Sequence, residues 1–115
     1  MLKAKIHNAR VTALKLEYEG SITIDRELIS LVDILPGEKV HVLNLNTGAR
    51  IETYVIPGDK GEICLNGPAA RTGQVGDKLI ILSYVLVSDD IARKEWHPHM
   101  LYLDENNRPV KVVKK

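Results

Sequence analysis

The chain has 115 residues, 44% of them hydrophobic and 27% charged, which is ordinary for a single soluble globular domain. Its net charge is +1 and only 4% of its residues are aromatic, so it lacks the basic surface and stacking rings of a nucleic-acid-binding protein. No apolar run approaches the roughly 18 residues of a membrane span, and the charged segment Met1–Leu16 does not resemble a secretory signal. We therefore expect a cytoplasmic domain that binds neither nucleic acid nor membrane.

The first third of the chain predicts strands followed by one short helix. Apolar and polar residues alternate in places over Leu2–Leu16, which indicates one or two strands, and β-branched residues follow each other in Ser21–Ile24. Asp25 is a typical helix N-cap, and the apolar residues after it have helical spacing up to Val32. We expect Leu35-Pro36-Gly37 to end this helix.

The middle of the chain predicts a β-hairpin and a further strand. Alternation over Lys39–Leu45 and again over Arg50–Ile56, with the turn signal Asn46-Thr47-Gly48 between them, is typical of a hairpin. Pro57–Gly61 is expected to form another turn, and Glu62–Leu65 a short strand. The only cysteine, Cys64, lies in this apolar run, so it is expected to be a small buried side chain and cannot form a disulfide within the chain.

The last third predicts more strands and short helices. The expected elements are a helical turn over Ala69–Thr72, a long apolar strand over Lys78–Val87, a short helix over Ile91–Glu95 that Ser88-Asp89-Asp90 caps, and final strands over Met100–Leu103 and Val110–Val113. Many short strands separated by glycine turns, with two or three short helices, favour a compact β-barrel in one domain.

The dipeptide Gly20-Ser21 follows the first predicted strands and has two interpretations. Glycine-serine pairs most often form turns. They are also the pair that a self-cleaving peptide bond needs, because glycine leaves its carbonyl open to approach and the serine hydroxyl can attack that carbonyl. The residues around the pair must decide between these interpretations.

Several separated motifs occur in the order and spacing of one known family. They are Lys5-Ile6-His7, Tyr18-Glu19-Gly20-Ser21, Asn46-Thr47-Gly48, Arg50 with Thr53-Tyr54, Asn66-Gly67-Pro68-Ala69-Ala70, and Gly76-Asp77. Taken together, they make the chain resemble the pyruvoyl-dependent aspartate 1-decarboxylases over almost its whole length. The resemblance implies a small six-stranded double-psi β-barrel and a homotetramer with active sites between subunits.

The resemblance also implies that an inactive precursor cuts itself between Gly20 and Ser21. The products would be a β chain of residues 1–20 and an α chain of residues 21–115, with a pyruvoyl group made from Ser21 as the covalent cofactor. That group would act as an electron sink in the conversion of L-aspartate to β-alanine and CO2, which feeds pantothenate biosynthesis. Cleavage proceeds either unaided or with a maturation factor, and the residues leave both alternatives open.

The resemblance assigns processing and catalytic roles beside the cut. Thr53 supplies a hydrogen bond during cleavage, His7 lies beside the cleaved bond, and Tyr18 helps to orient it. Tyr54 is the proton donor in catalysis, since a phenol is protonated at neutral pH. Without the resemblance, Thr53 and Tyr54 read as ordinary strand residues and His7 as structural.

Substrate contacts follow in the same way. Arg50 suits a substrate carboxylate because its guanidinium binds bidentately, and Lys5 adds positive charge; alone, both read as surface residues. Asn66 would donate to an oxyanion or hold the substrate adduct. Thr53 and the backbone of Gly67, Pro68 and Ala69 are expected to line the pocket. Pro68 stands where the family often has a small residue and removes one backbone donor, and Leu43 stands where some members carry tryptophan.

Two alternatives to this enzyme remain open at this stage. Leu35–Val40 resembles segments of other small barrels, including transcription regulators, so a non-enzymatic oligomeric binding or regulatory module is the second hypothesis. A family member that stays an uncut precursor is the third. His97 and His99 flank a proline, but two ligands do not make a metal site, so we assign no metal. Asp89-Asp90 is interpreted as a helix cap and not as a catalytic pair.

Overall fold

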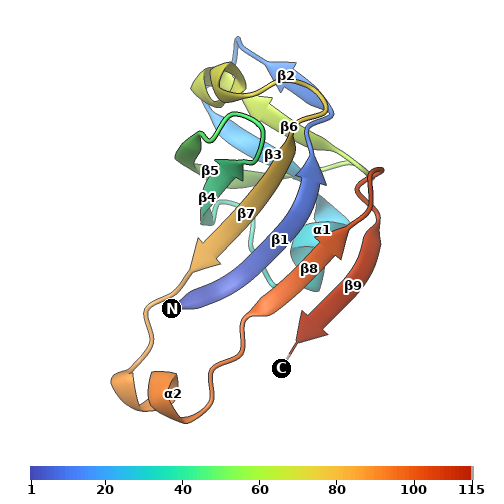
Figure 1. Ribbon diagram of the computed structural model, residues 1–115. Helices are drawn as coiled ribbons and strands as arrows, with labels where there is room; N and C mark the ends of the chain where they lie inside the picture. The colour runs from blue at the N-terminus through green and yellow to red at the C-terminus, as the bar shows by residue number, and fades with distance from the viewer. Residues whose placement is uncertain (115) are drawn as a thin grey trace.

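Nine strands dominate the computed structural model, which describes residues 1–114 (Figure 1). The strands are β1 (Leu2–Arg10), β2 (Ala13–Lys15), β3 (Ser21–Asp25), β4 (Lys39–Asn44), β5 (Arg50–Gly58), β6 (Ile63–Asn66), β7 (Lys78–Tyr84), β8 (His99–Leu103) and β9 (Pro109–Lys114). Two short α-helices, α1 (Arg26–Leu31) and α2 (Asp89–Lys94), and a 3-10 helix, η1 (Gly67–Thr72), lie between them. The predicted mainly-β class with short helices is confirmed.

The strands pair in the order β2-β6-β3-β5-β4-β7-β1-β8-β9, so β2 and β9 are the edge strands and the sheet is not closed. Strand β1 is held on both sides, because it pairs antiparallel with β7 and parallel with β8. Strand β3 likewise lies between β5, to which it is parallel, and β6, to which it is antiparallel. The two strands that flank residues 11–20 are therefore both interior to the sheet.

Two predicted boundaries are wrong, and the pairing explains both. Strand β5 continues through Pro57-Gly58, where a turn was expected, because these residues stay paired with Ile24 and Asp25 of β3. Strand β7 ends at Tyr84, short of the predicted Val87, because its partner β1 begins at Leu2. The remaining expected elements are present within a few residues of their predicted bounds.

The core is a single cluster of aliphatic side chains from the faces of the strands that turn inward. In β4, for example, the even-numbered residues Val40, Val42 and Asn44 are buried, whereas Lys39 is exposed. Fully buried members include Ile6 of β1, Ile22 and Ile24 of β3, Leu65 of β6, and Leu79 and Ile81 of β7. Alternation of this kind is what a sheet with one buried face requires. Among the described residues, no helix has the length and apolar character needed to cross a membrane.

Asp25 joins the end of β3 to the start of α1. Its Oδ1 accepts a hydrogen bond from the Glu27 backbone N–H at 2.8 Å, which is the predicted N-cap. Its Oδ2 accepts another from the Gly61 N–H at 2.8 Å, although Asp25 is buried. This side chain thus fixes the helix and the turn between β5 and β6 to the same point.

Glu38 links β1 and β7 to the loop that precedes β4. Its Oε1 accepts hydrogen bonds from Lys3 Nζ at 2.7 Å and from the Leu35 N–H at 3.1 Å, and its Oε2 accepts one from the Ser83 hydroxyl. Burial would raise the pKa of the Glu38 carboxyl, but the hydrogen bonds from Lys3, Ser83 and Leu35 outweigh it and lower that pKa.

A lowered pKa predicts how the Glu38 contribution depends on pH. Because the folded state favours the ionised carboxylate, its stabilisation is complete above the usual pKa of about 4.5 and is lost as the pH falls through the lowered value. We expect Glu38→Gln to reduce the free energy of unfolding by about 1–2 kcal/mol near neutral pH, as measured by urea denaturation. The difference between wild type and variant should shrink below the usual pKa; a difference that stays constant into strong acid would contradict the role of the charge.

Candidate active site

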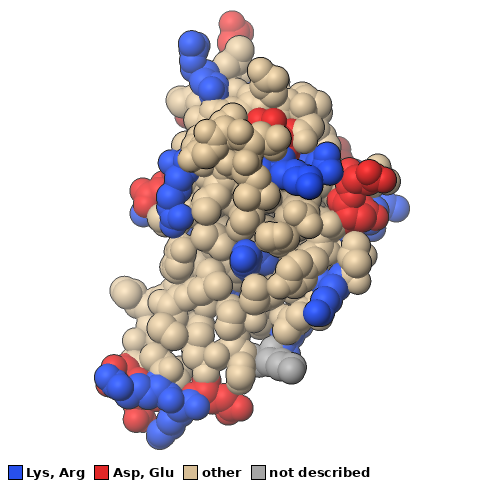
Figure 2. Space-filling model, in the orientation of Figure 1, with Lys and Arg blue, Asp and Glu red and all other residues tan. Residues whose placement is uncertain are grey.

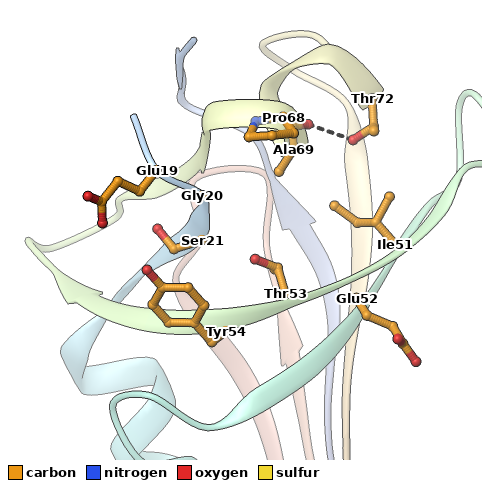
Figure 3. Close-up of a pocket in the computed structure, with 10 residues that line it drawn as sticks. All are labelled: Glu19, Gly20, Ser21, Ile51, Glu52, Thr53, Tyr54, Pro68, Ala69 and Thr72. Atoms are coloured by element: carbon orange, nitrogen blue, oxygen red, sulfur yellow. Dashed lines mark hydrogen bonds between the residues drawn. The ribbon is translucent and has the colours of Figure 1, made fainter. Parts of the chain in front are cut away.

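A cavity of about 500 Å³ opens where β3 begins, beside the middle of β5 and the start of η1 (Figure 3). It is lined by Glu19, Gly20, Ser21, Ile51, Glu52, Thr53, Tyr54, Pro68, Ala69 and Thr72. Six of the residues that the resemblance singled out are therefore brought together here: Gly20, Ser21, Thr53, Tyr54, Pro68 and Ala69. A space of this size accommodates a small metabolite.

Gly20 and Ser21 enter the cavity with an unusual backbone. Gly20 has φ 138° and Ser21 has φ 117°, so both lie in the region that side chains other than glycine avoid. Ser21 is also completely buried, although it ends an exposed segment that includes Tyr18. A non-glycine residue held at such an angle stores on the order of 1–3 kcal/mol, which the surrounding contacts must supply.

Asn66 is the contact that holds the Ser21 side chain. Ser21 and Asn66 lie directly opposite each other in the antiparallel pair of β3 with β6. Asn66 is buried, and its Nδ2 donates to Ser21 Oγ at 2.8 Å and to Thr23 Oγ1 at 2.9 Å. The serine oxygen therefore accepts a hydrogen bond, and its own proton is free to be given elsewhere.

Gly67 holds the backbone on the other side of the Gly20-Ser21 bond. It has φ +61°, and a Cβ at this position would lie 2.4 Å from the Tyr18 carbonyl oxygen and 2.8 Å from the Gly20 nitrogen. No side chain fits between the two segments without a shift of backbone atoms. The start of η1 is thus packed directly against residues 18–20.

Thr53 and Tyr54 reach the cavity from β5. The parallel register of β3 with β5 pairs Ile22 with Val55, so the preceding residues of the two strands lie alongside each other. Figure 3 shows the Tyr54 hydroxyl directed towards Ser21 and the Thr53 hydroxyl directed towards the same space. Tyr54 is 42% exposed, so its phenol is accessible to a small molecule in the cavity.

Lys5, His7 and Arg50 lie elsewhere, on the face of the sheet that turns away from the core. Across β1, β7, β4 and β5, the register aligns His7 with Ile80, Leu43 and Arg50 in one row, and it places Lys5 in the next row. His7 packs against the Tyr102 ring with the centroids 5.6 Å apart. Burial, and then the charges of Lys5 and Lys78, lower the pKa of His7, so this ring is neutral at physiological pH.

The structure adds cavity residues that the sequence did not single out, namely Glu19, Ile51, Glu52 and Thr72. The lining contains two carboxylates and, among the described residues, no lysine or arginine. Ile51 and Thr53 are two apart on one strand, so strand periodicity could have suggested Ile51. Glu19 and Glu52 directly precede Gly20 and Thr53, which the sequence did single out, whereas Thr72 depends on the approach of a separate segment, which the sequence does not reveal.

Comparison with known proteins decides the family. The model of the aspartate decarboxylase family matches residues 1–110. The chain belongs to the aspartate decarboxylase family. It is 56% identical to the aspartate 1-decarboxylase of Desulfitobacterium hafniense, over 98% of this chain and 90% of that protein. It is 54% identical to the aspartate 1-decarboxylase of Thermoanaerobacter pseudethanolicus, over 97% of both chains.

Membership of the aspartate decarboxylase family confirms the resemblance seen in the sequence and makes the chain a decarboxylase. The match covers nearly the full length of both proteins. The hypothesis of a non-enzymatic binding or regulatory barrel is therefore set aside. In this family member, the residues of the Gly20-Ser21 segment and of the Asn66–Ala69 segment meet at one cavity.

Substitution of Gly67 tests whether η1 fixes the segment before Ser21. We expect Gly67→Ala to push the backbone of residues 18–20 out of place and to make this segment more sensitive to limited proteolysis, because its Cβ would meet backbone atoms. Gly48→Ala is the matched control, since Gly48 has φ +78° but open space around it. Equal cleavage of the two variants by the protease would show that the close approach is unimportant.

Proposed function

We propose that this chain decarboxylates L-aspartate to β-alanine and CO2 with a pyruvoyl group that it makes from Ser21. The observation that carries the proposal is the buried Ser21 hydroxyl, held by Asn66 at a cavity on a strained backbone that follows Gly20. The names of the related proteins support the substrate. The supply of β-alanine to pantothenate biosynthesis is part of the same proposal.

Cleavage of the precursor follows from the chemistry of Ser21. Its Oγ attacks the Gly20 carbonyl carbon, the Gly20–Ser21 C–N bond breaks, and the Oγ proton passes to the Ser21 nitrogen, which leaves an ester. Loss of the Ser21 Cα proton then breaks the Cβ–Oγ bond and frees the Gly20 carboxylate. Water replaces the nitrogen of the resulting enamine, and ammonia leaves. No oxidant is needed, and relief of the strain at Ser21 favours the first step.

The fold is compatible with a cut at this bond. Residues 1–20 include β1, which stays paired with β7 and β8 after the cut. After the cut, the new end of the β chain must move away from residue 21. This end includes the exposed side chains of Leu16 and Tyr18, so its movement would expose no core residues. A β chain of residues 1–20 and an α chain of residues 21–115 would therefore remain one folded domain.

The residues around Ser21 fit a small carbonyl group at the new chain end. Asn66 Nδ2 is a buried donor at hydrogen-bond distance from the atom that Ser21 now presents, and the cavity lies in front of it. Once formed from Ser21, the pyruvoyl group would supply an electron sink for loss of CO2 from the substrate. Tyr54, whose hydroxyl is directed towards Ser21, is placed to give the proton that replaces CO2.

Binding of aspartate requires positive charge that the cavity of one chain does not provide. Its described lining has Glu19 and Glu52 but no cation. A homotetramer with active sites between subunits solves this problem if a neighbouring copy brings Arg50 and Lys5 to the cavity. The outward row that contains Arg50 and His7 also contains Leu43 and Ile80, which suits a surface covered by another subunit.

Two finer features belong to the same proposal. We place the chain in the six-stranded double-psi β-barrel fold, which is supported by the family match and by the parallel pairs of β3 with β5 and of β2 with β6. We also expect Thr53 to donate a hydrogen bond during cleavage, since its hydroxyl is directed towards the same space as the Ser21 side chain. The segment before the cut is exposed, so it is accessible to a maturation factor.

Replacement of Ser21 tests the source of the cofactor. Ser21→Ala has no hydroxyl to attack Gly20, so we expect one intact chain in denaturing mass spectrometry and no release of CO2 from aspartate. Ser30→Ala, on the exposed side of α1, should cleave and turn over like the wild type. Decarboxylation by the uncut Ser21→Ala chain would disprove the proposed cofactor.

Replacement of Tyr54 separates catalysis from cleavage. Tyr54→Phe keeps the ring but loses the proton, so we expect normal cleavage and a kcat lowered at least 100-fold, in line with general acid catalysis. Tyr84→Phe provides a control for removal of a half-exposed phenol on strand β7, which does not pair with β5. If Tyr54→Phe turned over as fast as this control, another group would have to be the proton donor.

A further inference from the structure

We infer that Cys64 is a positioning residue for self-cleavage, because its thiol fixes which end of the Asn66 side-chain amide faces Ser21. This inference rests on the proposed function, since it concerns the step that makes the cofactor. It gives a role to a cysteine whose apolar neighbours in the sequence indicate packing alone.

The two strands place four polar side chains on one face of a small ladder. In the antiparallel pair of β3 with β6, Ser21 lies opposite Asn66 and Thr23 lies opposite Cys64. Residues two apart on a strand point to the same side, so all four side chains meet. Cys64 Sγ is 3.3 Å from Asn66 Oδ1, whereas its other acceptor, the Leu65 carbonyl oxygen, is 3.9 Å away. Asn66 is the better-placed acceptor of the thiol proton.

Every polar group of the Asn66 side chain is then used. Its Oδ1 accepts from the Cys64 thiol, and its two Nδ2 protons go to Ser21 and Thr23. In this orientation all three polar groups of the amide are paired, whereas a reversed amide would turn both Nδ2 protons towards the Cys64 sulfur, which is a weak acceptor. The proton that residue 64 offers to Oδ1 completes the set, and a serine hydroxyl at that position could make the same donation. Cys64 therefore selects the orientation in which the NH2 faces Ser21.

The orientation matters because Ser21 Oγ must carry charge during cleavage. When the Cβ–Oγ bond breaks, this oxygen leaves as part of the Gly20 carboxylate, and the Nδ2 donor stabilises the charge that develops on it. A reversed amide would present Oδ1 to Ser21 instead. The Ser21 hydroxyl would then donate its proton to Asn66, and the leaving oxygen would lose its donor.

Burial keeps Cys64 in the form that can donate. Its side chain is completely buried, and burial raises the pKa of the Cys64 thiol. The group is therefore a neutral thiol at physiological pH, with its proton available to Asn66. A thiolate at this place would accept a hydrogen bond and favour the opposite amide orientation.

The test compares Cys64→Ala, which loses the donor, with Cys64→Ser, which keeps one. Freshly purified precursors are incubated with and without extract of the producing cells, and cleavage is followed by denaturing mass spectrometry. We expect Cys64→Ala to cleave roughly three- to tenfold more slowly than Cys64→Ser, as the loss of one hydrogen bond implies. Neutral hydroxylamine, which cuts the ester between residues 20 and 21, should reveal more accumulated ester in Cys64→Ala.

Two further variants separate hydrogen bonding from packing. Cys64→Val fills the space without a donor and should be slow like Cys64→Ala, which also keeps the test valid if the alanine variant folds poorly. Val42→Ala removes a buried side chain on β4, away from Asn66, and should cleave at the wild-type rate despite its lower stability.

The outcomes are distinct. Cleavage of Cys64→Ala and Cys64→Val at the rate of Cys64→Ser would overturn the inference, and so would equal slowing of all three, which would indicate size as the cause. In both cases normal cleavage of the wild type would leave the proposed function standing. A wild-type chain that never cleaves, with or without extract, would instead overturn the proposed function and the inference with it.

Discussion

The buried hydrogen bond from Asn66 to Ser21 is the interaction on which the rest of the site depends. It holds a serine whose backbone lies in a region that serine avoids, next to a glycine that adopts such an angle without strain. Gly67 closes the other side by its contact with the backbone before the cut. The core that packs around β3 and β6 supplies the stability to maintain this geometry, which an isolated segment would relax.

The sheet topology explains why the proposed chemistry would occur at this point. Strand β3 begins at Ser21 and lies between β5 and β6, so one neighbour brings Tyr54 and the other brings Asn66. Of the strands that precede the proposed cut, β1 is anchored between β7 and β8, so a break in the chain would not release it. Figure 2 shows charged side chains scattered over the visible face, with a mixed group of lysine, arginine and acidic residues at the protruding end that carries α2. Because β1 would stay anchored, the fold would keep both products of the proposed cut in one domain.

Local signals in the sequence predicted the elements, whereas contacts between distant segments could not be predicted from them. Alternation in Lys39–Leu45 and the N-cap Asp25 predicted a strand and a helix that the structure contains, the strand as Lys39–Asn44. The extension of β5 through Pro57 depends on pairing with β3, and the contact of Cys64 with Asn66 depends on the register of two strands. The roles assigned to Arg50, Lys5 and His7 came from the family resemblance alone, and the fold of one chain leaves these residues out of the cavity lining.

The most direct test of the account asks whether residue 21 carries a ketone. Purified protein is incubated with L-aspartate and sodium cyanoborohydride, and the denatured products are weighed by mass spectrometry. The account predicts a fragment of residues 1–20 and a fragment of residues 21–115 that carries one reduced, substrate-derived adduct on its first residue. A preparation that releases CO2 from aspartate but contains one uncut chain, with serine at position 21 and no adduct, would contradict it.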